Sequence, residues 1–105
     1  MKKWGLIKLN LSYLDQFNIK DTNYIKGVLN TDTLTKLTVM KDIVTENLNY
    51  LKEFGVKNLT NVIVNRPDIL FRTNSKLKQN LTTLDQELLI YIFENSIDDL
   101  VNFNI

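Results

Sequence analysis

Cysteine, histidine and alanine are all missing from this chain of 105 residues. Without cysteine there is neither a disulfide nor a thiolate, and without histidine there is no side chain that normally titrates near neutral pH. Together these two absences remove the usual zinc ligands and the usual nucleophile–base pairs. We therefore expect a non-enzymatic protein with no catalytic residues, no metal site and no cofactor. The lack of alanine is attributed to an A/T-rich source genome.

Carboxylates are the catalytic material that remains, for example Asp68 or the pair Asp98 and Asp99. No glycine-rich phosphate loop, nucleophile elbow or metal motif accompanies them. Because acid pairs at a helix end are usually solvated, an enzyme is the least favoured of the three function classes considered below.

Long hydrophobic runs are also scarce near the start of the sequence. Gly5, Lys8 and Asn10 interrupt the first apolar residues, so neither a signal-peptide core nor a spanning helix of about 20 residues can be drawn. The first arginine is Arg66, which excludes an Arg-rich mitochondrial leader. The length and the 44% hydrophobic content favour one domain over residues 1–105. We expect a cytoplasmic protein that makes no membrane contact.

The stretch Asn47–Leu84 has the pattern of short helices separated by turns. Its first leucine stripe stops at Gly55-Val56, where glycine can take the left-handed conformation that ends a helix. Asn58 can cap the next helix, and Pro67 cannot continue a helix but can begin one. The stretch therefore indicates one helical repeat unit.

The letters of this unit, LNYLKEFGVKNLTNVIVNRPDIL, resemble the repeat of the mitochondrial transcription termination factor family. Modules of that family combine a leucine-rich helix ending in Gly-Val with a second helix and a Pro-x-x-Leu or Pro-x-Ile-Leu turn. The resemblance implies a helical solenoid whose curved basic groove binds duplex DNA or structured RNA.

Two further copies of the unit are weaker. Residues 11–20 align with residues 48–57 at an offset of 37, with Asn18 at the glycine position. The offset then shrinks to 35, which puts Asp32 at the proline position. A third copy is expected to begin at Leu81–Leu84, without glycine or proline. We predict an all-α fold, a short stack of two to three degenerate units forming a small solenoid or bundle. The alternative is an ordinary helical bundle, in which similar leucine stripes also arise.

Hydrophobic spacing predicts helices throughout the chain. A long helix capped by Asp32 is expected to continue to Phe54, and the last helix is expected to begin with a capping box of Thr83 and Gln86. The apolar run 88–93 is compatible with a strand, but its flanks favour a helix. The residues predicted to be buried together are Leu48, Leu51, Phe54, Val62, Ile69, Leu70 and Leu81.

Charge is distributed unevenly along the chain. Residues 1–84 hold thirteen lysines and arginines and seven acids, a net charge of +6, whereas residues 85–105 hold five acids and no base. The acidic segment either turns away from the basic body or covers it until a ligand displaces it. Five cations lie near the ends of the short helices and are the predicted nucleic-acid-binding residues: Lys57, Arg66, Arg72, Lys76 and Lys78.

The leading function class is a small nucleic-acid-binding helical-repeat protein that acts as a regulator or accessory factor. The second class is a protein-interaction module, for example a small inhibitor or adaptor, that uses the apolar last helix. Its contacts to a partner or to a second copy are expected through Leu88, Ile92 and Leu100. The aromatic residues give no independent support for base stacking, because nearly all fall on apolar stripes. Only Trp4 and Tyr24 lie outside one.

Overall fold

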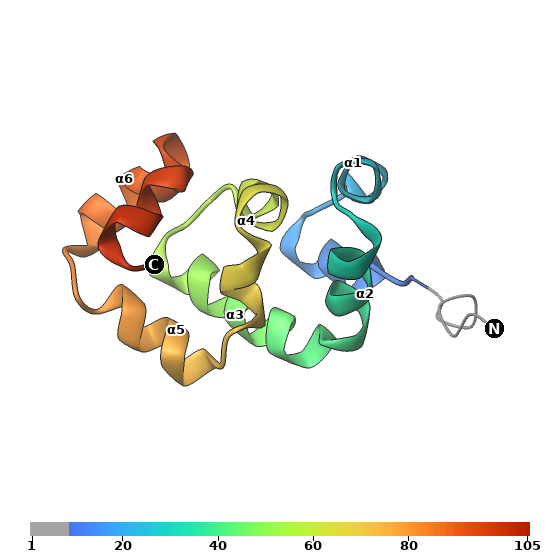
Figure 1. Ribbon diagram of the computed structural model, residues 1–105, viewed down its shortest axis with the longest axis horizontal. Coiled ribbons are helices and arrows are strands. Elements are labelled where there is room, and N and C mark those ends of the chain that lie inside the picture. Colours follow the sequence, from blue (N-terminus) through green and yellow to red (C-terminus); the bar gives the residue numbers. More distant parts are fainter. Residues whose placement is uncertain (1–8) are drawn as a thin grey trace.

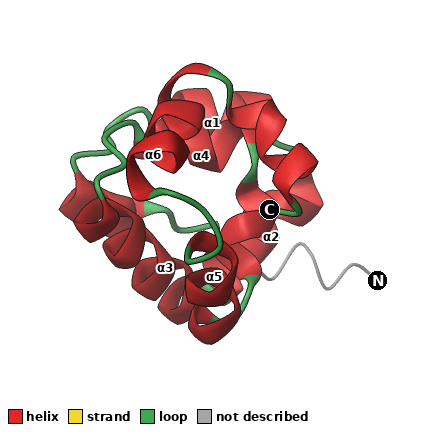
Figure 2. Ribbon diagram, turned by 90° about the vertical axis from the view of Figure 1, so that its left-hand side faces the viewer, coloured by secondary structure: helices red, strands yellow, loops and turns green. Residues whose placement is uncertain are grey.

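Helices make up all the regular structure of residues 9–105, the part of the chain that the computed structural model describes (Figures 1 and 2). No strand occurs among these residues, which confirms the all-α prediction; Trp4 lies outside them. Every helix in this range is too short or too polar to cross a bilayer. The elements, with η for 3-10 helices, are η2 (Ser12–Phe17), α1 (Thr22–Val28), α2 (Thr31–Val39), α3 (Lys41–Phe54), α4 (Leu59–Asn65), η3 (Pro67–Phe71), α5 (Asn74–Leu81), α6 (Gln86–Asn95) and η4 (Ile97–Phe103).

Both views place α1, α4 and α6 along one side of the molecule and α2, α3 and α5 along the other (Figures 1 and 2). The longest helix, α3, contacts η2, α2, α4, η3 and α5 and so runs through the centre. Its buried side chains Val44, Leu48 and Leu51 are spaced four and three residues apart, which puts them on one face. Six of the seven side chains predicted to be buried together are buried, and Phe54 is half-buried.

The long helix expected over residues 32–54 is divided at Met40, whose φ of −100° and ψ of 29° end α2. Asn30 rather than Asp32 caps α2, because its Oδ1 accepts a hydrogen bond from the Thr33 N–H at 2.8 Å. The apolar stripe continues across the break, so hydrophobic spacing alone did not reveal it.

The last helix begins later than expected. Asp85 caps α6, accepting a hydrogen bond from the Leu88 N–H at 3.1 Å. Gln86, expected to form a capping box with Thr83, instead donates from Nε2 to the Phe54 carbonyl oxygen at 2.6 Å. The capping-box prediction was therefore wrong, because a tertiary acceptor at the end of α3 is available to the amide. The apolar run within α6 is helical, as predicted.

A single sequence pattern, Leu-x-x-Phe followed by Asn or Gly and then Ile or Val, ends three helices. Its fifth residue is left-handed each time, with φ of 61° at Asn18, 122° at Gly55 and 63° at Asn104. The N–H of the sixth residue donates to the carbonyl oxygen of the leucine five positions earlier, which is the bond of a Schellman helix end. The sixth side chain is buried each time. The copies are residues 14–19, 51–56 and 100–105.

The third copy of this helix end was missed by the sequence interpretation, which looked for the third unit at Leu81–Leu84. The identical tripeptides Phe17-Asn18-Ile19 and Phe103-Asn104-Ile105 were the available signal. They were overlooked because the search followed leucine spacing rather than the residues that terminate a helix.

The helix end at Gly55 gives a matched pair of substitutions. A Cβ at Gly55 would have an unfavourable φ and would lie 2.6 Å from Ile90 Cδ1, whereas a Cβ at Gly27 in α1 meets nothing within 4 Å. We expect Gly55→Ala to lower the free energy of unfolding by about 1–3 kcal/mol and Gly27→Ala to raise it by about 0.5–1 kcal/mol. Urea unfolding followed by circular dichroism measures both, and equal effects would contradict the assigned role of Gly55.

Candidate nucleic-acid interface

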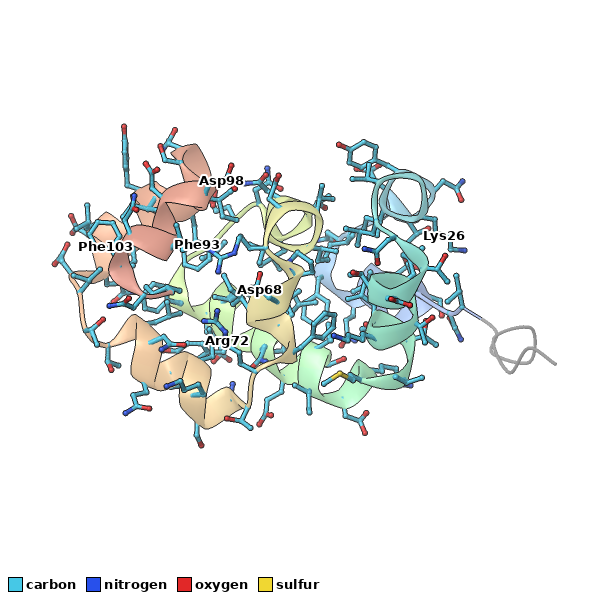
Figure 3. The ribbon with its side chains drawn as sticks, viewed as in Figure 1. Lys26, Asp68, Arg72, Phe93, Asp98 and Phe103 are labelled. Carbon is cyan, nitrogen blue, oxygen red and sulfur yellow. The ribbon has the colours of Figure 1, made fainter. Side chains whose placement is uncertain are left out.

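Arg66 and Arg72, two of the predicted binding residues, converge on one carboxylate. Arg66 donates from Nε and Nη2 to the two Asp68 oxygens at 3.0 and 2.9 Å, and Arg72 Nη2 donates to Asp68 Oδ2 at 3.1 Å. Both arginines also donate to the carbonyl oxygen of Ile105, at 2.7 and 2.8 Å. Figure 3 shows Asp68 and Arg72 side by side near the middle of the molecule. These guanidinium groups therefore connect η3 to the third helix end.

Local sequence explains how this cluster forms. Pro67 begins η3 and places Asp68 in its first turn, two residues after Arg66 and four before Arg72. The side chain of Arg66 is only 15% exposed, and its Nη1 is buried without a hydrogen-bond partner among the described residues. Arg72 also donates a hydrogen bond from Nη1 to Asn80 Oδ1 at 3.0 Å. Both arginines are thus engaged within the fold.

Electrostatics within the cluster act on Asp68. Burial by itself raises the pKa of this carboxyl, but the hydrogen bond from Arg66 and the charges of Arg66 and Arg72 outweigh it, so the net pKa is lowered. The hydrogen bond to Asp68 raises the pKa of Arg66. The carboxylate is therefore held in its charged form as the partner of two cations.

A buried asparagine fixes the turn between η3 and α5. Asn47 is fully buried in α3, and its Nδ2 donates to the carbonyl oxygens of Leu70 and Arg72 at 2.9 and 2.7 Å. Its Oδ1 accepts from Asn74 Nδ2 at 3.0 Å. Every polar atom of this amide is thus satisfied, as burial requires. No sequence pattern indicated this role, because Asn47 lies beside a leucine stripe and carries no motif of its own.

The three predicted lysines remain exposed, on two sides of the molecule. Lys57 precedes α4, whereas Lys76 and Lys78 belong to α5, and both ribbon views place α4 along one side of the molecule and α5 along the other (Figures 1 and 2). The Lys78 ammonium lies over the Tyr50 ring at 5.6 Å from its centroid. The fold therefore does not gather the five predicted cations on one surface.

A hollow of about 440 Å³ lies where the first helix end meets the start of α4. Two lysines line it, and one of them, Lys52, was not among the predicted binding residues. The rest of the lining combines amides and a hydroxyl with apolar side chains. The lining residues are Phe17, Asn18, Ile19, Lys52, Val56, Lys57, Asn58, Leu59 and Thr60.

The acidic segment touches the far end of this surface. Glu94 of α6 accepts hydrogen bonds at one oxygen from the backbone N–H groups of Lys57 and Asn58, at 2.8 and 3.2 Å. Asp98 and Asp99 line a separate hollow with Glu94 beside α4. A carboxylate of the acidic segment thus contacts the backbone of two residues that also line the lysine-lined hollow.

The function of this surface has to be argued from its geometry. Within residues 9–105, no three acidic side chains come close enough to hold a metal ion. Comparison of the chain with protein-family models, curated proteins and solved structures finds no match. The hollow lined by Lys52 and Lys57 has the positive charge that a polyanionic ligand requires.

The arginine cluster predicts a pH-dependent stability. Asp68→Asn should lower the free energy of unfolding by about 1–2 kcal/mol at pH 7, less than for a fully buried pair because the Asp68 side chain is 54% exposed. Since the folded-state pKa is depressed, this stability is present above the unfolded pKa of about 4 and is lost as pH falls through the folded value.

Thermal unfolding at several pH values between 7 and about 2 measures this difference. The gap in Tm between the wild type and Asp68→Asn should shrink as the pH falls below about 4. Asp21→Asn is the control, because Asp21 is exposed and forms no ion pair among the described residues. A gap that stays constant down to pH 2 would rule out the ionic role of Asp68.

Proposed function

We propose that this chain is a small nucleic-acid-binding helical-repeat protein, in which repeat units resembling those of the mitochondrial transcription termination factor family stack side by side. The threefold occurrence of one helix end carries this proposal. Three copies with the same left-handed residue and the same backbone hydrogen bond are not required by helical bundles in general. They are expected of a repeat, in which each unit must turn the chain in the same way.

Packing between the first two units supports the same interpretation. In both units the helix end is followed by one lysine, then by Asp21 or Asn58, and then by a seven-residue helix, α1 or α4. These two equivalent helices contact each other. Neighbouring units that meet through equivalent helices are the arrangement from which solenoids are built.

The ligand is assigned from the hollow between these units. Lys52 and Lys57 supply cations, and Asn18, Asn58 and Thr60 supply neutral polar groups, the combination that contacts phosphate and sugar oxygens in nucleic-acid complexes. Arg66 and Arg72 are left out of the primary contact because their guanidinium groups donate to Asp68 and to the Ile105 backbone oxygen, and their side chains are mostly buried. Two lysines make few phosphate contacts, so weak and strongly salt-dependent binding is expected.

A double substitution of the hollow's lysines tests the proposal. Lys52→Ala with Lys57→Ala should weaken binding of fluorescent DNA or RNA at low salt about tenfold or more, and should lower the slope of log affinity against log salt by roughly 1.4–1.8. Lys26→Ala with Lys41→Ala removes the same charge from two other exposed sites and should change both quantities less. Reversal of Arg66 or Arg72 is unsuitable as a test, because it would also break the cluster around Asp68.

Fluorescence anisotropy with duplex DNA, single-stranded DNA and RNA measures these effects, and circular dichroism checks that each variant is folded. No binding of the wild type to any of these nucleic acids at low salt would rule out the proposed function. If both double variants lose the same affinity for nucleic acid, the loss reflects overall charge, and the hollow is not the contact surface.

A protein partner at the C-terminal segment is the second candidate function, favoured by four large apolar side chains that remain exposed on α6 and η4: Leu88, Tyr91, Val101 and Phe103. Of the three contacts expected from the sequence, only Leu88 is exposed, because Ile92 and Leu100 are buried in the core. Exposed apolar side chains on an acidic segment suit an apolar or basic partner.

Substitution of the exposed apolar side chains distinguishes the two functions. Tyr91→Ser with Val101→Ser should abolish any concentration-dependent association seen in sedimentation experiments while leaving nucleic-acid binding unchanged, since neither residue lines the lysine hollow. Loss of nucleic-acid binding in this variant would show that the two surfaces are not separate.

A further inference from the structure

Tyr24 of α1 faces a second, smaller hollow beside the lysine-lined one. This hollow measures about 200 Å³ and lies between α1 and α4. Its lining consists of Tyr24, Asn58, Thr60, Asn61, Val64 and Asn65. Asn58 and Thr60 also line the 440 Å³ hollow, so the two hollows adjoin along the start of α4.

Tyr24 and Tyr91 are the two tyrosines of the described chain whose rings are exposed and have no partner within residues 9–105, and of these two Tyr24 lines the smaller hollow. Tyr13 is half-buried and donates its hydroxyl to the Leu37 carbonyl oxygen at 2.6 Å, and Tyr50 packs against Phe54 and lies under Lys78. Tyr24 is 58% exposed, and within residues 9–105 it has neither a hydrogen bond nor an aromatic partner. An aromatic face that the fold leaves open beside a polar hollow is suited to stacking on a flat ligand.

The polar groups around this ring include both a donor and an acceptor that the fold does not use. Asn58 Oδ1 accepts from the Asn61 N–H, which leaves its Nδ2 as a donor. Asn65 Nδ2 donates to Asn61, which leaves its Oδ1 as an acceptor. Among the described residues, no hydrogen bond engages either free atom. A nucleobase edge presents donors and acceptors of just this kind.

The two hollows therefore match the two parts of a nucleotide. The smaller hollow offers an aromatic face and amides to a base, and the larger one offers Lys52 and Lys57 to the phosphates next to it. In a duplex the faces of the bases are covered by their neighbours and only their edges are accessible in the grooves. An unpaired base can leave the stack and pack on a tyrosine, as bases do in single-strand complexes.

We infer that the ligand of this surface is single-stranded nucleic acid, with an unpaired base stacked on Tyr24 and the neighbouring phosphates beside Lys52 and Lys57. This inference rests on the proposed function and changes its ligand, because duplex DNA and structured RNA were the ligands implied by the family resemblance. The shared chemistry is an unpaired nucleotide, which single-stranded RNA and single-stranded DNA both present.

Tyr24 can be tested by substitutions that separate its ring from its hydroxyl. Tyr24→Ala should weaken binding of single-stranded oligonucleotides of about a dozen residues by about 5- to 150-fold, the range that one base–aromatic stack provides. Tyr24→Phe keeps the ring and should retain affinity within about twofold. Tyr91→Ala is the matched control, because Tyr91 is 62% exposed on the acidic helix α6 and lines neither hollow.

Fluorescence anisotropy with a single-stranded RNA, a single-stranded DNA of the same sequence and the matching duplex DNA measures all four proteins at one low salt concentration. We expect each single strand to bind at least about tenfold more tightly than the duplex. A preference between the two single strands would identify which source supplies the nucleotide. Stacking at Tyr24 should quench tyrosine fluorescence on binding, and Tyr24→Phe should reduce this quenching more than Tyr91→Phe does. Equal quenching in the two variants would contradict stacking at Tyr24.

The failures of the two proposals are distinguishable. Duplex binding as tight as single-strand binding, or equal affinities of Tyr24→Ala and the wild type, would overturn the inference while leaving nucleic-acid binding intact. Absence of binding to all three oligonucleotides would overturn both. Loss of affinity in Tyr91→Ala as large as in Tyr24→Ala would also overturn the inference, because it would show that the effect is not specific to the hollow.

Discussion

The fold depends on a left-handed helix end that occurs three times. At each occurrence the chain leaves its helix through Asn18, Gly55 or Asn104 and immediately buries an isoleucine or valine. The backbone bond to the preceding leucine holds that geometry, so the side chain after the turn always enters the core. The direction of the chain at the first two ends places α1 against α4, and this pair lines the smaller hollow of the candidate interface. The larger hollow lies between the first helix end, the end of α3 and the start of α4.

Two arginines bind the third helix end to the middle of the chain through hydrogen bonds to its backbone. Arg66 and Arg72 hold Asp68 and the Ile105 carbonyl oxygen together, so a segment rich in acids is anchored to the body through two arginines. Glu94 adds a second link at the start of α4. Charged side chains thus join the two parts of the chain through hydrogen bonds to backbone groups, and the lysines that face water remain for a ligand.

Much of the fold could be predicted from the sequence, and the candidate site much less. The leucine stripe of α3, the helix end at Gly55 and the cap at Asn58 follow from local preferences. Local preferences did not reveal the break at Met40, since apolar spacing continues through it. They also predicted a capping box at Gln86 that does not form. The Gln86 side chain donates instead to the carbonyl oxygen of Phe54, an acceptor that comes close only in the folded chain.

By itself, the sequence determined that this protein is helical, lacks thiol and imidazole chemistry, and can end helices at Asn18 and Gly55, because these properties depend on residue types and on neighbours within one or two helical turns. Only the tertiary structure decided which cations face water. Arg66 and Lys57 both stand at the edge of α4, yet Arg66 is held by Asp68 and Lys57 opens onto a hollow. The role of a charged side chain depends on the groups that other segments bring within a few ångströms, and no local pattern encodes those distances.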